Sequence, residues 1–80
     1  MNEKLRNVVA EVLGIPVGQV TESTSTDTED SWDSLRHMNI IFALEDAFGI
    51  LFTDDEINRL VSVAQIEEIV AGKVRGNPEQ

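Results

Sequence analysis

Apolar residues recur at helical spacing along this chain, and no segment alternates with the period of two that marks a strand. In residues 2–13 they form one stripe, made of Leu5, Val8, Val9, Val12 and Leu13. Gly14 can adopt the left-handed conformation that closes a helix, and Pro16 prevents the helix from continuing. The pattern predicts a first helix over residues 2–13, after which Ile15 and Val17 fold back onto the core.

The second helical segment, residues 33–48, carries apolar side chains on two faces. Asp33 suits the N-cap position, and Gly49 suits the terminator. The stripe suited to a core consists of Ile40, Ile41, Leu44, Ala47 and Phe48. A second set on the neighbouring face consists of Leu35, Met38 and Phe42. One amphipathic helix does not need both sets, so either the helix is nearly surrounded or the second set is kept for a partner.

Two capping patterns predict the remaining helices. Residues 53–56 fit a capping box with Thr53 as the cap, which opens a short helix ending near Leu60. Residues 62–65 fit a second box, and the helix that it opens carries inward Val63, Ile66, Ile69, Val70 and Val74. Lys73 lies near the end of this helix, where the helix dipole favours a cation. The predicted fold class is all-α, a four-helix bundle with three longer helices and one short helix.

A long loop separates the first two predicted helices. Residues 21–31 are all Ser, Thr, Asp or Glu, a composition that cannot bury itself. The whole link, residues 15–32, is longer than most structureless connections in compact domains and would let the second helix run in the same sense as the first or cross it. Trp32 precedes the cap, where an apolar side chain can staple the start of a helix. We therefore predict a buried Trp32; the alternative is an exposed Trp32 in a partner surface.

Length and composition indicate one small domain. With 80 residues, of which 41% are hydrophobic, the chain can form a core but not an enclosed cleft as well. We expect a domain over residues 1–75 and a flexible tail over residues 76–80. There is no cysteine, so disulfides and thiolate metal sites are excluded. No apolar run approaches the ~20 residues that span a bilayer, and the start of the chain is polar, so we expect a cytoplasmic protein that does not insert into membranes.

The net charge of −9 is confined to the middle of the chain. Residues 22–58 contain ten acidic residues and one basic residue, Arg36, whereas acidic and basic residues balance outside this range. Such a field repels nucleic acid and steers basic protein partners. A solvated surface that only keeps the domain soluble is the plainer explanation. The confinement of the charge favours a docking face.

Two kinds of site are excluded by residue spacing. A twelve-residue calcium loop starting at Asp27 would place Trp32 where a glycine is needed and Met38 where a glutamate is needed, so no dedicated metal site is expected. Ser34 and His37 lie three residues apart on one helix, but the strained Gly-x-Ser-x-Gly turn of a serine hydrolase is absent. His37 is therefore interpreted as a partly exposed helix residue.

The candidate functional site is Ser34, in the tripeptide Asp33-Ser34-Leu35 at the start of the second helix. A hydroxyl at the first helical position points into solvent beside unsatisfied backbone N–H groups and the positive end of the helix. A phosphate attached there would lie in a favourable field. Taken alone, Asp-Ser before a helix is most often plain capping.

The surrounding sequence resembles the acyl carrier protein family. After the acidic loop and the Asp-Ser-Leu tripeptide, residues 43–49 read ALEDAFG and residues 52–57 read FTDDEI, and the similarity covers residues 3–74. The resemblance implies that Ser34 carries a 4'-phosphopantetheine arm, which a phosphopantetheinyl transferase adds from coenzyme A. The thiol of the arm would hold an acyl group as a thioester for acyl-loading and acyl-processing enzymes. The carrier itself would not be an enzyme.

A docking surface is predicted around this serine, on a chain that we expect to be a monomer. Its apolar centre is formed by the second set defined above, although ordinary core packing is the alternative for Phe42. The remaining predicted docking residues are acidic: Asp33, Glu45, Asp46 and Glu56. Ser31-Trp32 and Arg36 stand where carriers of fatty acid synthesis usually have a glycine with a small residue and an acid. The resemblance thus favours a dedicated acyl pathway, such as polyketide synthesis or lipid modification. An unmodified helical interaction domain is the alternative, and a minimal hydrolase with Ser34 and His37 is a distant third.

Overall fold

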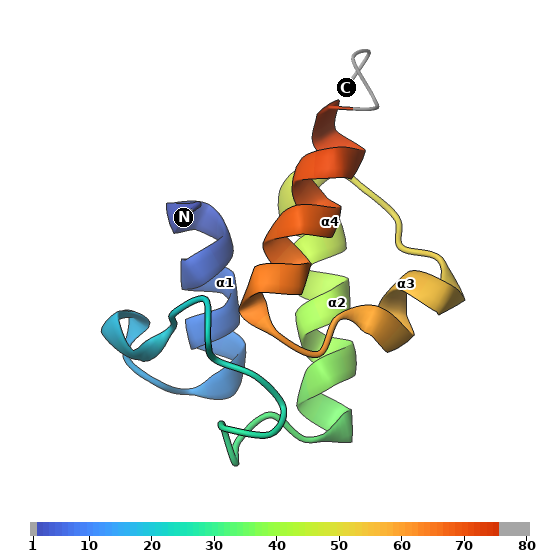
Figure 1. Ribbon diagram of the computed structural model, residues 1–80. Helices are drawn as coiled ribbons and strands as arrows, with labels where there is room; N and C mark the ends of the chain where they lie inside the picture. Colours follow the sequence, from blue (N-terminus) through green and yellow to red (C-terminus); the bar gives the residue numbers. More distant parts are fainter. Residues whose placement is uncertain (1, 76–80) are drawn as a thin grey trace.

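Helices make up most of the chain in the computed structural model, which describes residues 2–75 (Figure 1). Within that range the elements are α1 (Glu3–Leu13), a short 3₁₀ helix η1 (Val17–Gln19), α2 (Ser34–Phe48), α3 (Asp54–Arg59) and α4 (Val63–Arg75). The predicted all-α fold, with three longer helices and one short helix, is confirmed. The predicted tail, residues 76–80, lies outside the described residues.

The helix ends follow the capping signals in the sequence. Asn2 caps α1 by accepting the Leu5 N–H, and the side chain of Asp33 caps α2 by accepting the Arg36 N–H. Thr53 and Glu56 form the complete capping box at the start of α3. Gly14 and Gly49 end α1 and α2 at φ of 70° and 65°, where a side chain would be strained. The capping contact of Asp33 thus determines where α2 begins and places Ser34 at its first position.

The core lies where α1, α2 and α4 face one another. Its fully buried members include Leu5, Val9, Ile40, Ile41, Leu44, Val63 and Ile66. Two residues predicted to point inward do not: Val17 is 38% exposed and Val74 is 47% exposed. Val17 opens η1, which turns its side chain outward and buries the residue after η1, Val20, instead. Val74 lies in the last turn of α4, which extends past the start of α1 (Figure 1). Ile15 does pack against the core, as predicted.

The long loop reverses the direction of the chain between α1 and α2, but it is longer than this reversal requires, and it is held by contacts with the neighbouring helices. Figure 1 shows α2 running roughly opposite to α1, not in the same sense or across it as the loop length suggested. The length is used to cover the end of the bundle. The loop pairs with the α3–α4 junction, where Thr26 N–H donates to Val61 O and Val63 N–H donates to Thr24 O, both at 2.9 Å. Val20 and Thr24 are buried, so they anchor the loop to the core although residues 21–31 contain no apolar side chain.

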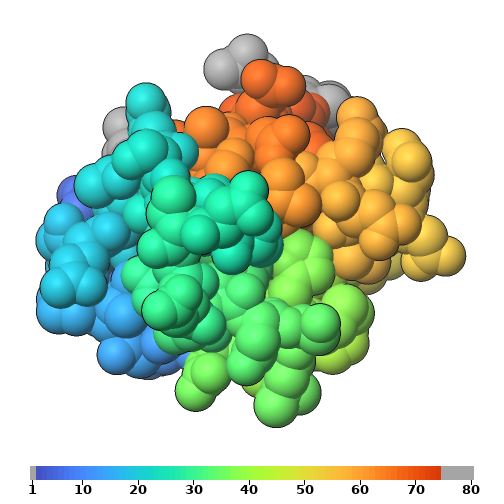
Figure 2. All heavy atoms as spheres, turned by 60° about the horizontal axis from the view of Figure 1, so that its bottom comes forward, coloured from blue at the N-terminus to red at the C-terminus, as the bar shows by residue number. Residues whose placement is uncertain are grey.

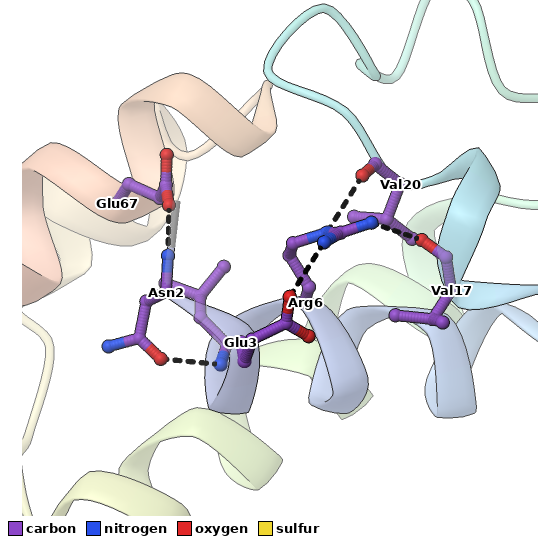
Figure 3. Close-up of polar contacts among 7 residues, drawn as sticks. Asn2, Glu3, Arg6, Val17, Val20 and Glu67 are labelled. Atoms are coloured by element: carbon purple, nitrogen blue, oxygen red, sulfur yellow. Dashed lines mark hydrogen bonds and ion pairs between the residues drawn. The ribbon is translucent and has the colours of Figure 1, made fainter.

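Arg6 of α1 holds the first half of this loop (Figure 3). Its guanidinium donates to the carbonyls of Val20 and Val17 at 3.2 and 2.9 Å, and it pairs with Glu3 at 3.0 Å. One side chain thereby satisfies two loop carbonyls and fixes the loop to the helix before it. The loop consequently leaves α1 in a defined direction and returns to deliver Trp32 at the start of α2.

Candidate functional site

Ser34 is the first residue of the fifteen-residue helix α2, and its side chain is exposed. The Asp33 carboxylate accepts the Arg36 N–H at 2.9 Å, and the Asp33 carbonyl accepts the His37 N–H at 2.8 Å. The N–H groups of Ser34 and Leu35 have no acceptor among the described residues. The Ser34 hydroxyl therefore stands beside two unused donors at the positive end of a long helix.

A groove of about 530 Å³ lies beside Ser34 and separates it from α3. Its lining includes Trp32, Ser34, His37, Met38, Ile57 and Val61. Figure 2 looks onto this end of the molecule, where the loop (teal to green), the first turns of α2 (green) and α3 (yellow to orange) share one face. The end of the loop and the start of α2, which are continuous in sequence, thus share this face with the more distant α3.

Trp32 is buried, with 4% of its surface exposed, and the predicted staple is confirmed. Its partner is His37, the staple position of α2: the rings are stacked with centroids 6.3 Å apart and an interplanar angle of 26°. The indole Nε1 donates to His37 Nδ1 at 3.1 Å, and His37 Nε2 lies 2.9 Å from the Ile57 carbonyl oxygen. Because both ring nitrogens are engaged, His37 cannot take a proton from Ser34, which removes the hydrolase alternative.

The second apolar set of α2 faces solvent. Leu35 is 72% exposed and Phe42 is 59% exposed, while Met38 is partly buried at the groove. Ordinary core packing, the alternative for Phe42, is therefore wrong. Leu51 is a further exposed apolar residue, which we did not predict. The sequence offers no signal for it, because residues 50–52 are all apolar, and only the structure shows that Ile50 and Phe52 point inward while Leu51 points outward.

Besides the cap Asp33, two of the predicted acidic docking residues have partners within the fold. Glu45 accepts the Phe52 N–H at 3.0 Å. Glu56 accepts the Thr53 N–H and pairs with Lys73 of α4 at 2.7 Å. The hydrogen bond from the Lys73 ammonium, and then that from the Thr53 N–H, lower the pKa of Glu56 below its usual value.

The other acidic residues of α2 and α3 reach solvent. Asp46 is exposed on α2, as are Asp54 and Asp55 at the start of α3. Asp33 combines its capping role with a 3.5 Å ion pair to Arg36, the one cation of the acidic range. The exposed negative charge of α2 and α3 is thus carried by Asp46, Asp54 and Asp55, the last of which also pairs with Arg59 at 3.3 Å, rather than by Glu45 and Glu56.

Among residues 2–75, no three potential metal ligands cluster closely enough to hold an ion. None of the helices described is long and apolar enough to cross a membrane. The arrangement instead defines a helical module that presents one exposed hydroxyl on a rigid helix, next to a groove and an acidic, partly apolar face.

Comparison with known proteins agrees with this class. Residues 3–70 match the family described as "Phosphopantetheine attachment site". The chain is 29% identical to an acyl carrier protein of Guillardia theta over 72 residues. The aligned region covers 90% of this chain and 89% of that protein. It superposes on a solution structure of a holo acyl carrier protein from Geobacter metallireducens with a TM-score of 0.85 at 30% identity, covering 100% of this chain and 94% of that one. The chain belongs to the acyl carrier protein family, whose members are carriers rather than enzymes and bear a covalently bound phosphopantetheine.

Proposed function

We propose that Ser34 is the attachment residue for the phosphopantetheine arm and that this chain carries acyl intermediates on it as thioesters. The observation that supports this most directly is the exposed Ser34 hydroxyl at the first position of α2, inside the matched range. The neighbouring serine, Ser31, is half-buried, and its hydroxyl donates to Glu29 at 2.7 Å. Of the two serines near the helix start, only Ser34 is open to a transferase.

The residues around Ser34 fit a phosphodiester at this position. The N–H groups of Ser34 and Leu35 point to the open end of the helix and can donate to phosphate oxygens. Asp33 takes up the Arg36 N–H and so fixes where the helix begins. When attached, the arm supplies a thiol that forms a thioester with an acyl group. The contribution of the protein is to hold the anchor on a rigid element and leave the arm accessible.

Docking of partner enzymes is proposed to use the outer face of α2 and the start of α3. Leu35 and Phe42 offer a small apolar centre, with Met38 at its edge. The exposed carboxylates of Asp46, Asp54 and Asp55, defined above, would steer basic partners. A carrier must bind and release several enzymes in turn, and electrostatic steering with a small apolar contact gives fast association without tight binding. In this proposal Asp33, Glu45 and Glu56 support the face mainly by fixing its backbone.

The partners proposed are a phosphopantetheinyl transferase and the enzymes that load and process the acyl group. Among pathways of fatty-acid or polyketide type, we favour a dedicated one. The support is the basic Arg36 close to the serine and the bulky Trp32 before the cap, both of which change the surface or the support of the attachment site. The carrier is proposed to act as a monomer in the cytoplasm.

Carriage of an acyl group can be tested on the full chain. The chain is first treated with coenzyme A and a transferase, and then with an acyl-activating enzyme and a fatty acid. The proposal predicts a stepwise mass gain of one arm and then one acyl group, with the acyl group alone released by hydroxylamine at neutral pH, as expected for a thioester. A chain that gains the arm but that no acyl-activating enzyme or acyltransferase loads would contradict acyl carriage. A chain that gains nothing would favour the unmodified interaction domain.

A further inference from the structure

The imidazole of His37 joins three segments that surround Ser34. Trp32, at the end of the loop, donates to one ring nitrogen, and the other lies at hydrogen-bond distance from the carbonyl of Ile57 in α3. His37 itself lies one turn after Ser34 on α2. All four residues line the groove described above. The imidazole is therefore the hydrogen-bonded link between the two walls of the groove.

The partners of the ring determine its protonation state. An indole N–H can only donate, so His37 Nδ1 must carry a lone pair. A carbonyl oxygen can only accept, so His37 Nε2 must carry the proton. Both bonds form together only on the neutral ring with its proton on Nε2. A second proton on Nδ1 would face the indole N–H, and the buried Trp32 would lose its acceptor.

We propose that neutral His37 is a positioning residue for Ser34, because it ties the loop end and α3 to the first turns of α2, and that its protonation releases the loop end. The bond to Ile57 survives protonation, since a charged ring still donates from Nε2. Protonation therefore breaks only the bond from Trp32, the residue that precedes the cap of α2 and packs against the first turns of the helix. Its consequence for arm transfer rests on the proposed attachment at Ser34.

The two hydrogen bonds of the His37 ring do not depend on the protonation of the charged groups on the neighbouring segments. These groups are Glu29 and Asp30 in the loop, Asp33 and Arg36 at α2, Asp54, Asp55, Glu56 and Arg59 at α3, and Lys73 of α4 behind them. Among the described residues, no hydrogen bond or ion pair joins the imidazole to any of these carboxylates or to Arg36 or Arg59, and Lys73 pairs with Glu56 at 2.7 Å. The chain contains a single histidine, so the ring whose protonation state is followed by NMR is identified without ambiguity.

Nitrogen-15 NMR of the full chain tests the link directly, because its one histidine and one tryptophan give unambiguous signals. At pH 7.5 we expect the proton on Nε2, a bare Nδ1, and a scalar coupling between His37 Nδ1 and Trp32 Nε1 across the hydrogen bond. As the ring protonates, this coupling should vanish, and the opening equilibrium of the indole N–H, measured by hydrogen exchange, should rise about tenfold. A proton on Nδ1 at pH 7.5, or Trp32 signals that ignore ring protonation, would overturn the proposal.

Two variants separate positioning from simple packing. His37→Gln keeps one acceptor and one donor without a titrating proton, so Trp32 signals should stay constant from pH 8 to 5. Trp32→Phe removes the donor, so the ring should still titrate while the Ser34 amide signal no longer responds. The native rate of arm transfer should fall relative to His37→Gln as the ring protonates; a constant ratio would overturn the positioning role. If neither chain accepts the arm, the proposed function fails, and the NMR result still decides whether the link exists.

Discussion

Arg6→Met is expected to destabilise the fold by removing the contact that fixes the long loop (Figure 3). The substitution keeps most of the apolar stem and deletes the guanidinium, whose donors contact Val20 O at 3.2 Å and Val17 O at 2.9 Å. No other side chain donates to either carbonyl in the described structure; Val17 O also accepts the Val20 N–H at 3.0 Å, so Val20 O is the carbonyl left without a partner. The loss should therefore appear directly in the free energy of unfolding.

The magnitude follows from the burial of each contact. Hydrogen bonds from a charged donor contribute roughly 1.5–3 kcal/mol when they are shielded from water. The Arg6 side chain is 22% exposed. The hydrogen bond to Val20 is part-buried, so we assign it the lower end of that range. The hydrogen bond to Val17 is exposed to solvent and contributes less. The ion pair with Glu3 is solvent-exposed, so it adds roughly 0.5 kcal/mol at most. We expect a total loss of about 2 kcal/mol, a large share of the stability of a small domain.

Urea unfolding followed by circular dichroism measures this loss, with Trp32 fluorescence as a second probe of the loop end. Glu3→Gln is the matched control, because it removes only the ion pair and should cost less than about 0.5 kcal/mol. The m-value should stay unchanged in both variants, since the same surface is exposed on unfolding. A loss below about 0.5 kcal/mol for Arg6→Met, equal to that of the control, would show that the loop is held without the guanidinium.

Three further predictions address the staple, the α3–α4 ion pair and the acidic face. Trp32→Ala should cost roughly 3 kcal/mol or more, because it empties a buried site and leaves His37 without its donor; native-like stability in urea would contradict this. Since the pKa of Glu56 is lowered in the folded state, its stabilising effect is present at neutral pH and is lost as the pH falls; the stability difference between native chain and Glu56→Gln should shrink below about pH 4. Asp46→Lys should slow arm transfer, and 0.5 M salt should weaken the effect, whereas Glu11→Lys, an equal charge change on α1, should not; equal rates for both variants would limit the acidic face to solubility.

The elements and their ends could be predicted from the sequence because the signals for them are local. Asp33, Thr53 and Gly49 determine helix ends through contacts within a few residues, and Trp32 staples α2 through a neighbour five positions away. The same holds for Ser34, whose exposure follows from its place in the first turn. Periodicity also separated the buried and exposed faces of α2.

What the sequence could not show depends on contacts between distant segments. Val20 is buried and Val17 is not, because of η1 and of Arg6. Arg6 contacts the carbonyls of both residues, although it precedes Val17 by eleven positions and Val20 by fourteen. Glu45 was predicted to face partners, but the position of its carboxylate depends on how the chain turns after α2 to offer the Phe52 N–H. His37 likewise reaches Ile57, twenty residues later, only because α3 folds beside α2. Local pattern does not determine such geometry.

The attachment of the arm to Ser34 is the central claim, and intact-mass spectrometry tests it most directly. The native chain, Ser34→Ala and the control Ser31→Ala are each incubated with coenzyme A and a phosphopantetheinyl transferase. We predict that the native chain and Ser31→Ala each gain the mass of one phosphopantetheine, with fragmentation placing it on residue 34, and that Ser34→Ala gains none. Modification of Ser34→Ala, or an unmodified native chain after treatment with several transferases that modify other carriers, would contradict the account.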